Sequence, residues 1–217
     1  MPTSGRRKKY LPGQTNKKSL RNMNSSPNQI NQLLILLDSW VPLSQAFRQE
    51  LSNSMQLQLV SARQQLNTSG RHLLHAWYSV DCWVTEQRLT EAGKSEVSAI
   101  YGPNTIFTDI NSFLKGETSH KQLIVIHGST LLKIDRQQFN LLRAYPETPL
   151  LLEHYLLLKQ ASDQWRLDLL ALPDYQKFNR FASSYPVGQL PGILCASFLR
   201  MTPSRYSAAK KLYNRSK

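Results

Sequence analysis

The stretch that decides the fold lies near the end of the chain, at residues 190–211: LPGILCASFLRMTPSRYSAAKK. Its first part, about residues 190–199, is predicted to form a short helix in which the small Ala196 lets a second helix approach. Thr202 and Pro203 then begin that second helix, because a threonine hydroxyl caps free helix amides and proline at the first position loses only an amide without a partner. Two short helices joined by a tight turn predict a helix-turn-helix.

The second of these helices is expected to have two different faces. Tyr206, Ala209 and Tyr213 recur at three- or four-residue spacing, which is typical of a side that packs on the protein. Hydroxyls and a guanidinium near the start of a helix suit the edges of bases, and lysines behind them suit phosphates. The residues predicted to contact DNA are Thr202, Ser204, Arg205, Ser207, Lys210 and Lys211.

The positive charge of the chain is concentrated at its two ends. The 217 residues include 27 Lys and Arg against 14 Asp and Glu. Residues 1–29 contribute seven cations and residues 175–217 contribute eight, and neither segment contains an acid. A near-neutral body between two basic ends is typical of a protein whose ends contact a polyanion, although basic ends also keep a protein in solution.

Other function classes lack their sequence features. No apolar run is long enough to span a bilayer, and no apolar segment follows the N-terminal charges as it does in a secretory signal, so we expect a cytoplasmic protein without membrane contact. Cys82 and Cys195 lie far apart with no CxxC spacing, which leaves neither a disulfide framework nor a zinc cluster. His72 and His75 could form half of a metal site, but a packed pair is the more common arrangement. Because phosphate-binding glycine loops are also missing, we expect no enzyme, no cofactor and no metal.

The rest of the pattern predicts an α+β protein. Residues 1–29 are polar and basic and are expected to be disordered. One helix is predicted from residue 30 to Pro42, and a second continues toward Val60. Short runs rich in β-branched and aromatic residues then predict a small antiparallel barrel or sandwich. Its six strands are expected at residues 73–79, 82–89, 96–101, 106–110, 123–127 and 129–134.

A long helix is predicted at residues 150–170, after a shorter one at residues 136–145. It carries leucines on more than one side, so it has more apolar surface than one neighbour can cover. One side can pack on the strands. The second side is then available either to the same helix of a second copy or to another part of the same chain, and the periodicity does not distinguish these.

Three segments carry a resemblance to a known family: FTDINSFLKGE at residues 107–117, LLKID at residues 131–135, and LRMTPSRYS at residues 199–207. Residues 31–212 as a whole resemble the Crp/Fnr superfamily of bacterial transcription regulators, in particular its divergent, Bacteroidetes-type branch. The resemblance implies the following order of domains. It is a disordered basic arm at 1–29, a cyclic-nucleotide-binding-like β-roll or jelly-roll sensor at 30–148, a dimerisation helix at 149–171, and a winged-helix-like helix-turn-helix domain at 172–217.

The resemblance also implies partners. Family members bind palindromic DNA as dimers, with one recognition helix in each of two successive major grooves. This implies double-stranded DNA and a second copy of the chain as partners, and RNA polymerase as a further candidate. A small-molecule effector is either unknown or absent.

The ligand pocket departs from the family pattern. In cyclic-AMP-binding members, a Gly-Glu pair contacts the ribose and an arginine about ten residues later pairs with the phosphate. The matching positions here are Thr108 and Asp109, then Ser119 with His120 beside it. Because no arginine stands there, a phosphate would lose its strongest charge-assisted contact. We therefore expect a degenerate pocket that does not respond to cyclic nucleotides.

The helix-turn-helix domain at 172–217, called the head below, also departs from the family pattern. The turn glycine usual in the family is Arg200, and the usual Ser-Arg pair is Ser207-Ala208, which removes a side chain that reads guanine. Arg205 could replace it, or the head has altered specificity. Two other hypotheses remain open: a ligand- or protein-binding β-roll with a vestigial DNA head, and an RNA or membrane-surface binder acting through the basic arm.

Overall fold

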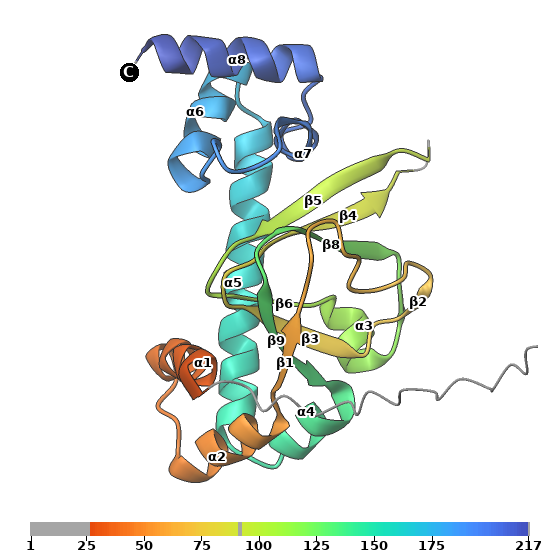
Figure 1. The fold of residues 1–217 in the computed structure, drawn as a ribbon, viewed down its shortest axis with the longest axis vertical. Helices are drawn as coiled ribbons and strands as arrows, with labels where there is room; N and C mark the ends of the chain where they lie inside the picture. The colour runs from red at the N-terminus through yellow and green to blue at the C-terminus, as the bar shows by residue number, and fades with distance from the viewer. Residues whose placement is uncertain (1–26, 91–92, 217) are drawn as a thin grey trace, which may run out of the picture.

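One long helix runs along the molecule, with a β-roll and two helices beside its first part and three short helices at its far end (Figure 1). The computed structural model describes residues 27–90 and 93–216. The predicted disordered arm therefore lies outside the described residues, except that its last three residues begin the first helix. None of the described helices is long and apolar enough to cross a membrane.

The first two helices are α1 (Pro27–Trp40) and α2 (Gln45–Ser54). Ser44 caps α2, since its side chain accepts a hydrogen bond from the amide of Phe47 at 3.2 Å. The prediction that this helix continues toward Val60 is wrong, because β1 (Gln56–Leu59) follows it directly and pairs antiparallel with a strand near residue 130. A ready partner strand outweighs the weak helical preference of these four residues.

The strands form three antiparallel sheets. The larger two have the orders β1-β9-β3-β6 and β5-β4-β8, and the third is the short pair β2-β7. This confirms the predicted antiparallel strand architecture, while β1, β2 and β7 were not predicted. The strands after β1 are β2 (Arg71–His72), β3 (His75–Ser79), β4 (Trp83–Leu89), β5 (Ser95–Tyr101), β6 (Thr105–Phe107), β7 (Thr118–Ser119), β8 (Lys121–His127) and β9 (Thr130–Asp135).

A short helix interrupts the strands where the sequence predicted a strand to residue 110. β6 ends at Phe107, and α3 (Ile110–Lys115) begins three residues later. Gly116 ends this helix in the left-handed conformation, with φ at 80°. Its amide bonds to the carbonyl of Ser112 at 3.0 Å, which is the usual way for a glycine to close a helix.

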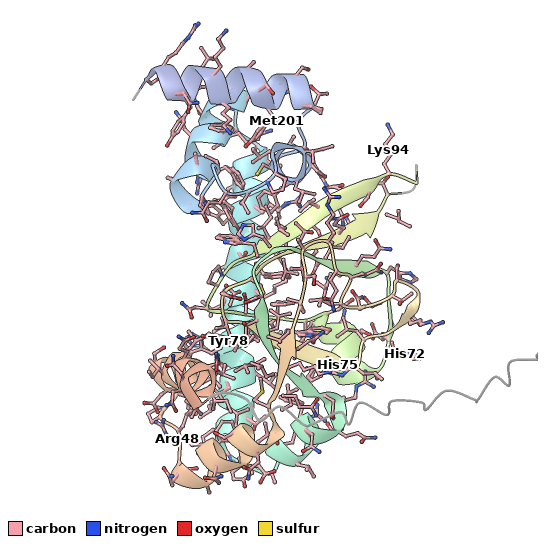
Figure 2. The ribbon with its side chains drawn as sticks, viewed as in Figure 1. Arg48, His72, His75, Tyr78, Lys94 and Met201 are labelled. Atoms are coloured by element: carbon pink, nitrogen blue, oxygen red, sulfur yellow. The ribbon has the colours of Figure 1, made fainter. Side chains whose placement is uncertain are left out.

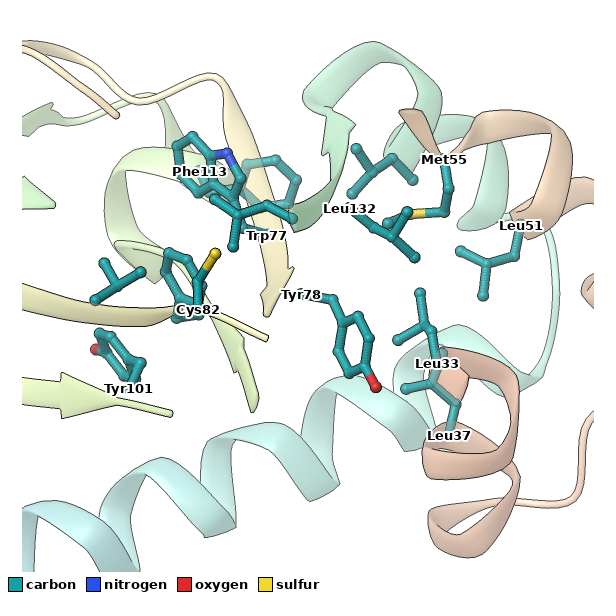
Figure 3. Packing of buried hydrophobic residues seen from close by; sticks show 14 of the residues in the cluster. Leu33, Leu37, Leu51, Met55, Trp77, Tyr78, Cys82, Tyr101, Phe113 and Leu132 are labelled. Atoms are coloured by element: carbon teal, nitrogen blue, oxygen red, sulfur yellow. The ribbon is translucent and has the colours of Figure 1, made fainter. Parts of the chain in front are cut away.

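Two apolar cores stabilise the molecule. The first joins the β-roll to α1 and α2, and Figure 3 shows Leu33, Leu51, Met55 and Tyr78 from these elements converging on one another. The second is shared by β5 and the three C-terminal helices, and it includes Val97 of the strand. Because one core crosses from the roll to the far end of the molecule, the two parts pack as a unit.

The turn between β8 and β9 can accept only glycine. Gly128 has φ at 109°, and a Cβ added there would lie 2.4 Å from the Cα of Cys82. We expect Gly128→Ala to lower the free energy of unfolding in urea by about 2 kcal/mol, from strain and steric overlap. Gly188→Ala is the matched control, since a Cβ there meets nothing within 4 Å, and it should be near neutral.

The long helix begins shortly after the roll ends. Asp135 caps α4 (Arg136–Leu142) through a hydrogen bond from the amide of Gln138 at 2.9 Å, as predicted. α5 (Glu147–Leu170) follows, close to the predicted bounds. One side of α5 packs on the roll through the buried Leu151 and on the head through Leu169, whose side chain is fully buried.

Candidate nucleic-acid interface

Three helices form the end of the molecule: α6 (Asp174–Ser184), α7 (Gly192–Phe198) and α8 (Pro203–Arg215). α7 and α8 are joined by a turn of four residues and pack on each other, so they have the predicted helix-turn-helix geometry (Figure 1). In the described part of this region, residues 172–216, there are helices and turns but no strand. The resemblance implied a winged-helix-like domain, but residues 172–216 contain no strand that could form a wing.

The start of α8 is built as the sequence predicted. Thr202 has extended backbone, and its hydroxyl accepts a hydrogen bond from the amide of Arg205 at 3.3 Å. Pro203 stands at the first helical position. The hydroxyls of Thr202 and Ser204 lie 3.0 Å apart and hydrogen bond to each other, and both residues are exposed at the start of the helix.

The two faces of α8 are also as predicted. Tyr206 and Ala209 are buried and pack in the second core. Ser204, Arg205, Ser207 and Lys211 are exposed, and Lys210 is half-buried. The structure thus places hydroxyls and cations on one outward side of this helix, and their contact with DNA stays a prediction.

Arg200 occupies the left-handed turn between α7 and α8. Its φ is 52°, a conformation that costs free energy in any residue with a Cβ. The adjacent amide of Met201 (labelled in Figure 2) donates to the carbonyl of Ala196 at 2.9 Å, which closes the turn. The Arg200 side chain leaves the head and donates from Nε to Oε1 of Glu96 on β5 at 2.8 Å.

Glu96 is the centre of an ion-pair cluster that links three parts of the molecule. Arg166 of α5 donates from Nη2 to Oε1 of Glu96 at 3.1 Å, and also to the carbonyls of Val97 at 3.0 Å and Phe198 at 3.2 Å. Burial alone would raise the pKa of Glu96, but hydrogen bonds from Arg200 and Arg166 bring it below its usual value. The cluster fastens the head to the β4-β5 hairpin and to the long helix.

Arg205, the predicted reader of bases, is held by an acid that sequence reasoning missed. Its Nε and Nη2 each donate to a carboxylate oxygen of Asp174 at 2.6 Å. The Arg205 guanidinium lowers the pKa of this carboxyl, and the carboxylate raises the pKa of Arg205. The one available hint in the sequence is that Asp174 is an acid directly before the acid-free basic segment.

Three of the four predicted ligand-pocket residues are engaged in hydrogen bonds within the protein. The Thr108 hydroxyl donates to the carbonyl of His75 at 2.9 Å, and the buried Ser119 hydroxyl donates to Oδ2 of Asp109 at 2.8 Å. His120 is exposed, and of the two nearby histidines labelled in Figure 2, His72 is exposed and His75 is half-buried. The structure therefore brings Asp109 and Ser119 together, and it leaves His120 on the surface.

A second acid, Glu86 on β4, is buried inside the roll. Its carboxylate accepts hydrogen bonds from the hydroxyls of Tyr101 at 3.0 Å and Ser98 at 2.8 Å, and it pairs with Nζ of Lys121 at 3.2 Å. Burial and the nearby charge of Glu86 raise the pKa of Tyr101 well above its usual value. Nothing in the sequence pattern marked this network, because its members come from three separate strands.

Two hollows lie near the roll and α5. One is a cleft of about 690 Å³ between α5, the β5-β6 turn and the end of α6, lined by several aromatic side chains. The other is an apolar cavity of about 120 Å³ between the first two helices, the roll and α5. Of the four predicted pocket residues, Thr108 borders the second hollow, and Asp109, Ser119 and His120 line neither.

Neither a protein-family model nor a curated protein matches the sequence. Solved structures do match the fold. The c-di-GMP responsive global regulator CLP of Xanthomonas campestris has a TM-score of 0.64 and 13% identity, over 80% of this chain and 93% of its own. A cyclic nucleotide-binding domain from Methylobacillus flagellatus has a TM-score of 0.58 and 14% identity, over 67% of this chain and 86% of its own.

The catabolite activator protein of Thermus thermophilus is a further match, with a TM-score of 0.52 and 16% identity over 83% of this chain and 87% of its own. Other matched chains are longer, and this chain spans 46% of one of them. These matches at 13% to 16% identity show a shared fold over most of the chain. The ion pairs described above are features of this chain's own residues. The chain therefore has a Crp/Fnr-like fold, in agreement with the resemblance of its sequence.

Proposed function

We propose that the chain is a dimeric, DNA-binding regulator of transcription that uses α8 as its recognition helix. The observation that carries the proposal is the outward side of α8, where Ser204, Ser207 and Lys211 are exposed at the end of the molecule. A helix of this kind, capped by a hydroxyl and followed by cations, suits the major groove and its flanking phosphates. The Crp/Fnr-like fold supports the same use, since its solved examples include transcription regulators.

The dimer part of the proposal rests on the side of α5 that faces away from the roll. Leu150 and Leu157 are 51% and 57% exposed and lie seven residues apart, with the small, exposed Ala161 four residues further on. Residues at this spacing share one stripe of a helix and are typical of a helix that pairs with another. Since no described part of the chain covers the two leucines, a second copy of α5 is the partner proposed for them.

Binding to duplex DNA at several salt concentrations tests the proposal. We expect the full chain to bind a labelled duplex of mixed sequence, and the logarithm of its affinity to fall linearly with the logarithm of salt, because bound cations displace counterions from the phosphates. Absence of duplex binding at low salt would overturn the proposal. It would favour instead the alternative of a ligand- or protein-binding roll with a vestigial head.

Lys211 is the first cation to test on α8. We expect Lys211→Gln to weaken binding to every duplex alike and to reduce the salt slope by about 0.9 for each protomer that loses a phosphate contact. Titration of fluorescent duplexes between low and moderate salt measures both quantities. Lys115→Gln is the matched control, since Lys115 is an exposed lysine of the roll, and an equal effect of both variants would contradict a specific role for α8.

Cyclic AMP is not expected to be the effector. The Asp109 and Ser119 side chains bond to each other, and the buried carboxylate of Glu86 inside the same roll pairs with Lys121, so neither acid leaves a cation for the cyclic phosphate. A ligand at a hundred times its dissociation constant stabilises a protein by about 2.7 kcal/mol, so millimolar cyclic AMP would raise the melting temperature clearly if it bound well. We expect a shift within the error of the measurement, and a rise of several degrees would contradict this.

A further inference from the structure

Asp174, which lies outside the proposed recognition helix α8, holds the side chain of Arg205 on that helix. It is the first residue of α6, and its two carboxylate oxygens bind Nε and Nη2 of Arg205, each at 2.6 Å. Two parallel hydrogen bonds between a planar guanidinium and a carboxylate fix the orientation of the guanidinium plane, which a single bond does not. Arg205 is thereby tied down although its side chain is more than half exposed.

The bonds to Asp174 use only one edge of the guanidinium. An arginine has five N–H donors, and the pair takes one from Nε and one from Nη2. The other edge, formed by Nη1 and the second N–H of Nη2, has no hydrogen-bond partner among residues 27–90 and 93–216. That edge is the fork which matches O6 and N7 of guanine.

We propose that Asp174 is a positioning residue for DNA recognition, which holds Arg205 so that its free edge reads a guanine. This inference rests on the proposed function and adds to it a base and a residue that sets specificity. Arg205 is the guanidinium near the start of α8, since the other arginine of this helix, Arg215, is its last residue. Asp174 also cancels the charge of Arg205, which makes the pair a weak attractor for phosphates in general.

Removing the Asp174 carboxylate is expected to lower discrimination for guanine and to raise affinity for duplex DNA in general. These opposite changes distinguish a positioning role from a merely structural one. Without the carboxylate, Arg205 is free to rotate and its bidentate contact is less favoured, so discrimination for guanine falls. Loss of the negative charge beside α8 also strengthens attraction to any phosphate backbone. A variant that merely damages the fold would weaken binding to all duplexes.

The experiment is selection of bound duplexes from a random pool by the full chain, followed by titration of the selected duplex and of single-base variants. We expect the wild-type chain to prefer one guanine per half-site by roughly tenfold or more over adenine. Arg205→Ala should abolish that preference. Asp174→Asn should reduce it to about threefold or less and raise affinity for unselected duplex by roughly two- to fivefold at low salt.

The control is Glu117→Gln, which removes an equal charge from an exposed site on the roll and should change neither quantity. Melting temperatures of all variants verify that the head stays folded. If the wild-type chain binds duplex and Asp174→Asn keeps the full guanine preference, the positioning inference is overturned and the proposed function stands. If the wild-type chain binds no duplex, both are overturned.

Discussion

Replacing Glu96 by alanine is expected to destabilise the protein by about 3 kcal/mol and to loosen the head from the roll. The carboxylate is 15% exposed and receives hydrogen bonds from Arg166 and Arg200. Arg166 is itself only 12% exposed, so without Glu96 its charge stays in a poorly solvated place with backbone carbonyls as its remaining acceptors. Removing one partner of a buried pair leaves such a charge uncompensated, which is the costly case.

Urea unfolding of the full chain measures this loss. Arg88→Ala is the control on the same cluster, because Arg88 is half-exposed and lies 3.7 Å from Glu96, and exposed pairs contribute less than about 1 kcal/mol. Equal losses for Glu96→Ala and Arg88→Ala would show that burial of the Glu96-Arg166 pair does not matter.

The same cluster predicts how stability depends on pH. The pKa of Glu96 is lower in the folded protein than its usual value of 4.5, so its contribution is fully present above that value. The contribution is lost as the pH falls through the folded pKa, when the carboxyl is protonated. We expect the difference in unfolding free energy between the wild-type chain and Glu96→Gln to be constant from pH 6 to 7 and to shrink below about pH 4.

Replacing Leu157 by lysine is expected to convert the proposed dimer to a monomer and to weaken binding to a selected two-fold symmetric duplex by roughly a hundredfold or more. Leu157 is 57% exposed in one protomer, so the substitution should leave the folded protomer intact. In the proposed dimer the α5 stripes of two copies face each other, so a lysine at this position places one charge from each copy in an apolar interface. The two charges are poorly solvated there and repel each other. The loss follows because two linked recognition helices bind one duplex far more tightly than one helix alone.

Sedimentation and DNA titration on the same preparations test this. Leu141→Lys is the matched control, since Leu141 is a leucine of α4 with a similar exposure of 56% and lies off the α5 stripe. A monomeric wild-type chain, or a Leu157→Lys variant that remains dimeric, would contradict the interface on α5.

The sequence was sufficient for those parts of the fold in which neighbouring residues decide the outcome. The cap at Thr202, the proline after it and the spacing of Tyr206 and Ala209 are local features, and all are found where they were predicted. β1 was missed because a four-residue strand is fixed by its partner β9, which lies more than seventy residues away. Local preference cannot reveal a distant partner.

The candidate site also combines features that local sequence predicts with contacts that it does not predict. The exposed hydroxyls and cations of α8 follow from helical periodicity, whereas the contacts of Arg205 do not. Asp174 stands 31 residues before Arg205, and Glu96 stands 104 residues before Arg200. Such pairs are created by the packing of whole elements, so they appear only once the chain is folded.

The apolar core that β5 shares with the C-terminal helices has a consequence for signalling. Val97 and Ile100 of the strand lie in the same cluster as Phe178, Phe198 and Leu199 of the head. Amide protons of the β4-β5 hairpin and of α7 and α8 should therefore become exposed in one cooperative opening, with one common free energy of opening in deuterium exchange. In the proposed dimer, we therefore expect a stimulus to act by changing how two protomers meet, because the shared core couples the roll to the C-terminal helices within each protomer.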